Sequence, residues 1–495
     1  MKIKLSSAIK TGLFLATTSV CLLAASAVLR SKESDYKYAD FFTNADKIDV
    51  LFIGSSHVIN AINPVELFDN FGITSYNMGG HGSVMQATYW ELQQALEFCR
   101  PKCVVVDTYM LQKDYQYLDT MDEDYSDSDR ETSVAQLHLN MDCWPLTDVK
   151  SAAIKDLIED PDIQKQFFAD FYVYHNRWEE LNSEDYKVLL GQSDRNPLYG
   201  AEMRYEMELA PNLGVDIPDE EVLEDESVGT MYLRRIIESC QANGIDVLVT
   251  YLPCSTDDSD KRADNTAHMI ANEYGVPFVN MLKEDVIDFY TDLNDTGHLN
   301  AIGALKASDY LGDVIAKRGI VPDHRGDPAY ADWQARAYLY NSALNSLAVE
   351  SENIYKQLHF LSLGGVSSIV YINDGSEAFG DTFFKKLIGN IAGSDAIISN
   401  TDGPYILIND AGTKKVYEAS AEKELAGIKT SIGTLNYLPV DHLIRLLYAD
   451  EDPDTNYLYD DEKLNYDIQV IAYDNETGEI LSHSYYKSYG CNYSQ

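Results

Sequence analysis

Cysteine is scarce in this chain of 495 residues, which contains seven. One of them, Cys21, lies within an apolar stretch near the N-terminus, and the others are too few for a disulfide-stabilised scaffold. Cys99 and Cys103 are four residues apart, but no second cysteine pair or nearby histidine pair supplies the remaining ligands of a zinc site. The sequence therefore excludes a disulfide framework and predicts no metal centre.

Positively charged residues are also scarce. Lysine and arginine total 38 against 80 aspartate and glutamate residues, which gives a formal net charge of -42 at pH 7. Such a surface repels the phosphate groups of nucleic acids and anionic lipid headgroups alike, so nucleic acid is not an expected partner. Because no calcium-loop spacing accompanies the acidity, we interpret it as a source of solubility outside the cell.

The chain also lacks a glycine-rich phosphate loop, internal repeats at solenoid or propeller periods, and low-complexity tracts. ATP use and repeat architectures are therefore not predicted, and no cofactor is expected. What is present is a composition with 45% hydrophobic and 11% aromatic residues, which is enough to build packed cores. At this length we expect two domains preceded by a short targeting segment.

The targeting segment comprises residues 1–32. Three lysines precede an uncharged stretch at residues 11–29, and basic residues return directly after it. The stretch is about long enough to span a bilayer, which takes roughly 20 apolar residues. Basic residues at the amino end favour a retained signal anchor with the rest of the chain outside the cytoplasm.

Two other processing routes are conceivable for this segment. Ala25-Ser26-Ala27 fits a signal-peptide cleavage site, so secretion after cleavage is the alternative to anchoring. Lipidation of Cys21 is not expected, because Val20 stands where a small residue is required. Anchored or cleaved, the body of the chain is predicted to be extracytoplasmic.

The body shows the pattern of an α/β domain, predicted at residues 33–325. Apolar runs, each ended by a polar or turn-forming residue, alternate with helical stretches. These runs lie at residues 48–53, 75–78, 103–106, 246–252 and 276–279. Continuous apolar runs are typical of strands buried on both faces. We therefore predict a three-layer α/β/α parallel sheet, with its crevice at the carboxyl ends of the strands.

The alternation lapses at about residues 110–228, an acidic and tyrosine-rich region with helical stretches at Ala152–Glu159 and Ile163–Tyr174. We interpret it as an insertion or lid. Its aromatic residues suit either stacking on sugars or a small core of its own, and the second is the commoner use.

A turn-rich segment at residues 319–328 indicates a domain boundary, so a smaller α+β domain is predicted at residues 330–495. It offers a helical stretch at Tyr338–Leu361. Strand-like runs follow at Ser368–Ile372, Tyr405–Ile408 and Ile468–Tyr473, and residues 474–478 then suit a hairpin turn. With no acid–base or metal set in it, we expect a binding or assembly module.

Polar residues that could carry chemistry lie just after the predicted strands. Ser56 follows Gly54 where a buried strand must turn into a helix, which exposes a side chain at the sheet edge. A serine hydroxyl needs a base to act as a nucleophile. His298 is the candidate, and Asp295, three residues before it, can accept a hydrogen bond from the other ring nitrogen. Residues 77–82 follow the second strand and could supply oxyanion donors.

These segments resemble the SGNH (GDSL-like) hydrolase superfamily, in which the first block carries the nucleophilic serine, here Ser56. The second block, an asparagine, any residue and the oxyanion-hole glycine, matches Asn77 and Gly79. The last block, an acid shortly before the catalytic histidine, matches Asp295 and His298. The resemblance covers about residues 48–317. It implies a flavodoxin-like sheet, a Ser–His–Asp triad, and an oxyanion hole formed by Ser56, Gly79 and Asn77.

The third block departs from the family. It should give an asparagine after the third strand, but the chain reads Val106-Asp107-Thr108-Tyr109. Thr108 or Tyr109 is a possible replacement donor. Together with Ser55 and His57 on either side of Ser56, this absence resembles the branch that contains teichoic acid D-alanyl-transfer and alginate O-acetylation proteins.

That branch implies extracytoplasmic transfer of an acyl group, such as acetyl, to a cell-surface or secreted polysaccharide through an acyl-enzyme. It also implies a membrane-bound O-acyltransferase as a partner. A secreted carbohydrate or lipid esterase is the alternative, and a non-catalytic scaffold that keeps the fold is a second alternative.

Four more residues are candidate substrate contacts: His57, His81, Asp107 and Tyr109. Each also has a simpler interpretation. His57 lies in a first helical turn and suits a helix cap, a lone loop histidine such as His81 is more often solvent-facing, and Asp107 at a strand end can be structural.

Overall fold

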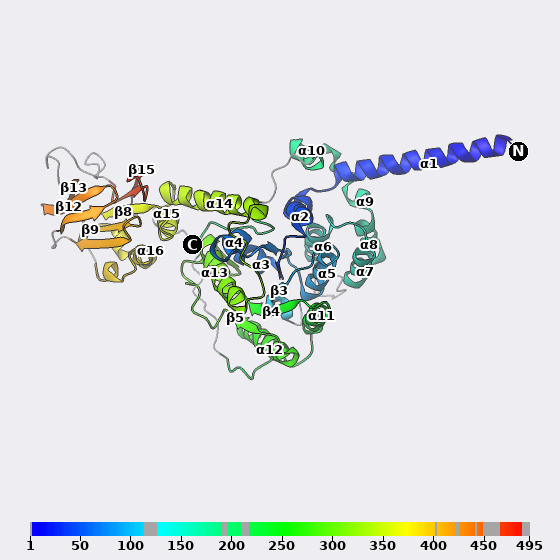
Figure 1. Cartoon of the computed structure of the whole chain (residues 1–495), viewed down its shortest axis with the longest axis horizontal. Helices are drawn as coiled ribbons and strands as arrows, with labels where there is room; N and C mark the ends of the chain where they lie inside the picture. The colour runs from blue at the N-terminus through cyan, green and yellow to red at the C-terminus, as the bar shows by residue number, and fades with distance from the viewer. Residues whose placement is uncertain are drawn as a thin grey trace. The chain divides into compact units, whose positions relative to one another are not determined.

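A computed structural model (Figure 1) describes residues 2–112, 126–190, 197–208, 217–400, 403–420, 425–440, 443–448 and 466–487. The chain forms two compact units. Residues 1–204 and 208–336 make the first, and residues 205–207 and 337–495 make the second. Each unit is described by itself.

The first unit ends later than the turn-rich segment at residues 319–328 suggested. Trp333 stacks on Tyr199 with 3.6 Å between ring centroids, and Arg336 forms an ion pair of 2.6 Å with the buried Asp40. Both residues lie on the first turns of α14 (Ala331–Val349). These contacts fix the start of α14 to the first unit, so the division falls inside this helix.

The centre of the first unit is a parallel sheet of five strands in the order β2-β1-β3-β4-β5. The strands are β1 (Val50–Ile53), β2 (Ser75–Asn77), β3 (Cys103–Asp107), β4 (Asp246–Tyr251) and β5 (Phe278–Asn280). This is the flavodoxin-like doubly wound order, in which ligands bind at the carboxyl ends of the strands. The predicted α/β/α class is confirmed.

Helices cover both faces of this sheet (Figure 1). They are α2 (Glu33–Asn44), α3 (Ser56–Ala61), α4 (Pro64–Phe71), α5 (Met85–Ala95), α11 (Val228–Ala242), α12 (Asp258–Tyr274) and α13 (Ala301–Arg318). α4 and α13 pack on each other and share a core with alternate strand residues, among them Phe52 and Val105. α5 and α11 pack together and contact β1 and β4. Burial of the strands from both sides explains their continuous apolar runs.

The inserted region is helical where the structure describes it. It contains η1 (Tyr109–Leu111), α6 (Asp127–Met141), α7 (Asp148–Leu157), α8 (Pro161–Phe168), α9 (Asp170–Tyr174), η2 (Arg177–Glu179) and α10 (Ser183–Leu189). The single helix expected at residues 163–174 is two helices, because Ala169 takes an extended conformation between α8 and α9. Phe167 is buried in a small core with Leu137 and Ile154, so part of the aromatic content builds this core.

The N-terminal helix α1 (Lys2–Leu29) begins the first unit. Its segment Ser7–Leu29 is long and apolar enough to cross a membrane, a test that a signal sequence also passes. At 1.5 Å per residue these 23 residues extend roughly 34 Å, against about 30 Å for the hydrocarbon core of a bilayer.

The second unit combines helices with antiparallel sheets. Its helical elements are α14, α15 (Ile354–Leu361), η4 (Glu377–Gly380), α16 (Thr382–Ala392) and η5 (Ala396–Ser399), and η3 (Pro328–Tyr330) lies just before α14. Strands β8 (Ser367–Ile372), β9 (Tyr405–Asp410), β10 (Lys415–Ser420), β14 (Ile468–Tyr473) and β15 (Ile480–Tyr486) form a sheet in the order β10-β9-β8-β14-β15. A three-stranded sheet adds β11 (Leu425–Thr430), β12 (Gly433–Val440) and β13 (Leu443–Tyr448).

One expectation for this unit is corrected and another is confirmed. The helical stretch at residues 338–361 is two helices, because Asn353 caps a new helix at Ile354 with its side chain. The runs at residues 405–408 and 468–473 are β9 and β14, and the turn at residues 474–478 joins β14 to β15 as a hairpin.

Candidate active site

The turn after β1 places Ser56 at the carboxyl end of that strand. Gly54 has φ +151°, and a Cβ there would lie 2.7 Å from the Val58 side chain, so only glycine fits this turn. Ser55 caps α3 by accepting a hydrogen bond from the His57 amide at 3.3 Å. Ser56 is therefore the first residue of α3, and its side chain is at the edge of the sheet.

The predicted acid and base lie on a short antiparallel hairpin of β6 (Leu293–Asp295) and β7 (His298–Leu299). The Gly297 amide donates to Asp295 Oδ1 at 2.9 Å and closes the turn. The buried Asn300 then holds the hairpin in place. Its side-chain amide donates to the Thr291 carbonyl at 2.7 Å, and its Oδ1 caps the first turn of α13.

Ser56, His298 and Asp295 meet at this edge. Ser56 Oγ lies 2.9 Å from His298 Nε2, and His298 Nδ1 lies 2.8 Å from Asp295 Oδ1. The side chains of His298 and Asp295 are 26% and 38% exposed, so a ligand in solvent can reach them. The structure thus brings together the three side chains that the sequence analysis selected.

The protonation state of Asp295 determines which atoms donate and which accept in this chain of hydrogen bonds. Burial alone would raise its pKa, but the adjacent His298 ring, the Asn294 amide and the Gly297 amide hold the pKa of Asp295 below its ordinary value. An ionised Asp295 can only accept, so Nδ1 of His298 carries the proton. Nε2 then presents a lone pair to the Ser56 hydroxyl, which is the arrangement that general-base catalysis needs.

The glycine loop after β2 packs against the turn that carries Ser56. A Cβ on Gly79 would lie 2.7 Å from the Ser55 carbonyl oxygen and 2.8 Å from the Ile59 nitrogen. The absence of a side chain at Gly79 therefore allows the two backbone segments to touch. This close approach places the Gly79 amide beside the turn of Ser56.

Asn77 does not have the role that the resemblance implied for its side chain. Its amide group donates to the Val58 carbonyl at 2.6 Å and to the Ile62 carbonyl at 2.8 Å, and its Oδ1 accepts from the Gly79 amide at 3.0 Å. Both amide hydrogens are thus committed to backbone, and the side chain is fully buried. Asn77 is a brace between β2 and α3, so its assignment as an oxyanion donor is wrong.

A buried lysine that sequence reasoning missed supports the same loop. Lys37 on α2 donates from Nζ to the Gly79 carbonyl, and Glu91 on α5 interacts with it electrostatically. Burial lowers the pKa of Lys37 and raises the pKa of Glu91 to about 8. Helical spacing could have identified Lys37 as buried, because it lies on the same side of α2 as Tyr38 and Phe41, both of which are fully buried.

Thr108, which follows β3, does not replace the oxyanion-hole asparagine that the chain lacks there. The Thr108 hydroxyl donates to the Thr250 carbonyl at 3.0 Å and is fully buried, which rules it out as a free donor. Asp107 is also buried, and its Oδ1 accepts from the Leu252 amide at 3.0 Å. Burial raises the pKa of Asp107 to about 7. Asp107 therefore braces β3 against the end of β4 and is not available as the substrate contact that was one prediction for it.

His57 and Tyr109 form one wall beside the triad. Their rings stack with 3.6 Å between centroids, and the His57 ring lies 5.3 Å from that of His298. Burial, and then the nearby His298, lower the pKa of His57 to about 3, so its ring is neutral. The ring stacks and does not cap α3, which corrects the simpler interpretation.

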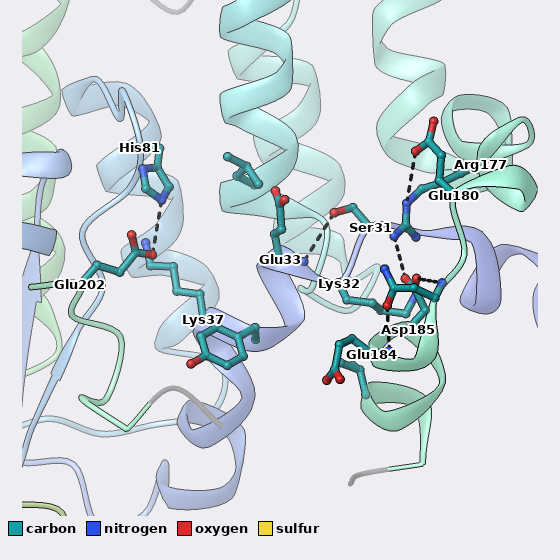
Figure 2. A pocket seen from close by; sticks show the side chains of 14 residues that line it. Ser31, Lys32, Glu33, Lys37, His81, Arg177, Glu180, Glu184, Asp185 and Glu202 are labelled. Carbon is teal, nitrogen blue, oxygen red and sulfur yellow. Dashed lines mark hydrogen bonds and ion pairs between the residues drawn. The ribbon is translucent and has the colours of Figure 1, made fainter. Parts of the chain in front are cut away.

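His81 lies on a separate cavity of about 890 Å³, whose lining contains none of the three triad residues. Its Nε2 is 3.6 Å from Glu202 Oε1, as Figure 2 shows. The hydrogen bond with His81 lowers the pKa of Glu202. His81 therefore has a charged partner and does not simply face solvent.

No protein-family model and no curated protein matches the chain. Several solved structures are similar, among them two from Bacteroides species. A candidate acylhydrolase from Bacteroides fragilis is 13% identical over 57% of this chain and 96% of its own, with a TM-score of 0.27. A GDSL-like lipase from Bacteroides thetaiotaomicron is 14% identical over 58% of this chain and 98% of its own, with the same TM-score.

Proposed function

We propose that the first unit is a serine-dependent acyl-transfer enzyme that works through an acyl-enzyme on Ser56. The observation that carries this proposal is the continuous relay from Ser56 Oγ to His298 Nε2 at 2.9 Å and from His298 Nδ1 to Asp295 at 2.8 Å. A serine at a strand-to-helix turn, backed by an imidazole that is hydrogen-bonded to an ionised carboxylate, is equipped to attack an acyl ester.

In the first half-reaction, Ser56 Oγ attacks the carbonyl carbon of an acyl donor as His298 Nε2 takes the hydroxyl proton. The tetrahedral intermediate collapses, the bond to the donor oxygen breaks, and the imidazolium returns the proton to that oxygen. In the second half-reaction, His298 takes a proton from an acceptor hydroxyl, and this oxygen attacks the acyl-enzyme. The proton then passes to Ser56 Oγ, which regenerates the free serine.

The oxyanion is served by backbone amides in this scheme. The Ser56 amide is at the first position of α3 and has no carbonyl partner within the helix. The Gly79 amide lies beside this turn, where it donates to Asn77 Oδ1 at 3.0 Å, and we propose that the oxyanion takes over this donor during the reaction. Two backbone donors, with no asparagine from β3, form a smaller oxyanion hole than the family pattern implies.

For the acceptor, we propose a hydroxyl of a cell-surface or secreted polysaccharide, with the body of the chain outside the cytoplasm and α1 as its anchor. The resemblance of residues 54–57 and 106–109 to extracytoplasmic acyl-transfer proteins supports this assignment. A membrane-bound O-acyltransferase would then deliver the acyl group. The apolar helix Ser7–Leu29 is compatible with such a location.

An esterase is the second candidate, favoured by one observation. His298 and Asp295 are open to solvent, at 26% and 38% exposure, so water can reach the acyl-enzyme. Water as the acceptor turns the same two steps into hydrolysis.

Mass analysis of the purified full chain after exposure to para-nitrophenyl acetate tests the proposal. We expect an acetyl group on Ser56, none on Ser56→Ala, and faster loss of the acetyl group with an oligosaccharide than with water alone. Loss to water at an unchanged rate in the presence of oligosaccharides would identify an esterase. Absence of an acyl adduct, together with no labelling by a serine-directed phosphonate, would leave a non-catalytic scaffold.

A further inference from the structure

Exposed aromatic side chains gather on the insertion around the point where α1 ends. Phe168, Phe171, Tyr172 and Trp178 lie between α8 and η2 and are 36%, 38%, 58% and 64% exposed. α9 and α10 both contact α1, and Figure 1 shows them beside the end of this helix. Single exposed aromatics are ordinary on a soluble domain, but a group of four in one short segment indicates an interaction surface. We call these four residues the aromatic face.

An apolar groove connects the aromatic face to α1. This cavity of about 580 Å³ is lined by Leu22 and Leu23 of α1 and by Phe168, Phe171 and Tyr172 of the insertion. Leu22 is seven residues before the end of α1, which corresponds to roughly 10 Å along the helix axis. Three members of the aromatic face, Phe168, Phe171 and Tyr172, therefore reach the level of the last two turns of α1, and Trp178 lies outside this cavity.

The insertion holds the end of α1 through Arg177. Its Nη1 donates to the carbonyls of Leu29 and Arg30 at 3.1 and 2.9 Å, and its Nη2 forms an ion pair of 2.7 Å with the buried Asp185. Figure 2 shows the Arg177–Asp185 pair. A cation at a helix C-terminus satisfies carbonyls that have no partner within the helix. These bonds fix the aromatic face in place relative to α1.

The chain just after α1 adds a second cap. Lys32 donates from Nζ to the carbonyls of Ala27 and Val28 at 2.9 and 3.2 Å. Cleavage after Ala27 would separate the capped turn from the rest of α1. The capping contacts therefore suit a chain that keeps this helix.

We propose that the aromatic face enters the outer leaflet of the membrane, and that lipid acyl chains fill the groove beside α1. The proposal rests on α1 crossing the bilayer. With Ser7–Leu29 as the span, Leu22 and Leu23 lie within the hydrocarbon region, and Phe168, Phe171 and Tyr172 face the same groove, whose lining also contains the charged Arg30, Asp142 and Lys150. Tyrosine and tryptophan are the residues most favoured at the membrane interface. Because the contact is apolar, it does not require anionic headgroups, which this acidic chain would repel.

Tryptophan fluorescence of the full chain in phosphatidylcholine nanodiscs tests the proposal. The difference between the spectra of the wild type and Trp178→Phe isolates the emission of Trp178. We expect lipids brominated along their acyl chains to quench most of this emission, and aqueous iodide to leave it almost unchanged. The variant is conservative and exposed, so its folding is not at risk.

A matched reporter comes from Tyr290→Trp in the Trp178→Phe background. Tyr290 is 42% exposed on the loop between β5 and β6, so we expect iodide to quench it and brominated lipid to leave it unchanged. Iodide quenching of Trp178 with no effect of brominated lipid would overturn the proposal and leave the aromatic face for a soluble partner. Failure of the full chain to enter nanodiscs would overturn the membrane-spanning role of α1 as well. Neither result bears on acyl-enzyme formation at Ser56.

Discussion

Lys37 on α2 donates a hydrogen bond from its buried Nζ to the carbonyl of Gly79, in the loop whose amide we assign to the oxyanion. The Gly80 amide donates to the Gly54 carbonyl at 2.9 Å. The peptide group between Gly79 and Gly80 is therefore fixed from both ends. Because α2 directly follows α1, the N-terminal helix and the glycine loop are joined by one short element.

Replacement of Lys37 by methionine should therefore weaken catalysis more than substrate binding. The methylene stem keeps its volume, but the Gly79 carbonyl loses its donor and the loop gains freedom near the oxyanion. We expect kcat for para-nitrophenyl acetate to fall about ten- to a hundredfold with a small change in KM. Lys165→Met on the exposed surface of α8 is the matched control. An unchanged kcat in a folded Lys37→Met protein would contradict the positioning role.

Asp295→Asn tests the tautomer argument. An asparagine can donate its amide hydrogen to Nδ1 of His298. The ring proton then lies on Nε2, so Nε2 cannot accept the hydroxyl proton of Ser56. We expect acetylation of Ser56 to slow by about a thousandfold or more. The fold should persist, because Asp295 is partly exposed. Asp313→Asn, an exposed carboxylate on α13, is the control and should react at the rate of the wild type.

The sequence was informative wherever a pattern had only one structural outcome. The apolar runs that became β1 to β5 could be buried only between two layers of helices, so strand identity and sheet type followed from them. The order of Ser56, residues 77–79 and Asp295–His298 along the chain placed these groups at one sheet edge. In the second unit, β8, β9 and β14 were found in the same way.

The sequence was uninformative where the role of a side chain depends on tertiary contacts and the local sequence allows more than one role. Asn77 and Thr108 lie at the carboxyl ends of strands, where oxyanion donors are expected. Each side chain, however, turns inward and donates to a backbone carbonyl. Lysine is usually a surface residue, but Lys37 occupies a position on the buried side of its helix. Only tertiary packing decides whether such a residue is buried or exposed. β10 and β11 have weak apolar alternation, because several of their side chains are exposed.

Gly79→Ala should damage both stability and catalysis. Its new methyl group would lie 2.7 Å from the Ser55 carbonyl oxygen, a backbone atom that cannot move aside without shifting the turn of Ser56. Overpacking of this kind costs about 1 to 3 kcal/mol. Thermal unfolding and the rate of Ser56 acetylation measure the two effects. Gly380→Ala is the matched control, because a Cβ there meets nothing within 4 Å. Normal activity of Gly79→Ala would separate the loop from the oxyanion site.

Asp107→Asn should make the fold more stable at alkaline pH. Burial raises the pKa of Asp107 to about 7, against an ordinary value of 3.8. Between these two values the folded state holds a proton that the unfolded state releases, so the stability contributed at this position is highest in acid and falls as the pH rises towards 7. The buried Glu66 and Asp264, whose pKa values burial raises to about 7, add slopes of the same sign.

An asparagine at position 107 cannot ionise, and its Oδ1 can still accept from the Leu252 amide. Urea unfolding at pH 5 and pH 8 should therefore show a smaller loss of stability with pH in Asp107→Asn than in the wild type. The variant should gain about 2 to 4 kcal/mol relative to the wild type at pH 8. Asp313→Asn should leave the pH dependence unchanged, because this carboxylate is half exposed. If Asp107→Asn and the wild type lose stability equally between these pH values, Asp107 is ionised in the folded protein at pH 5 and its brace is a charged one.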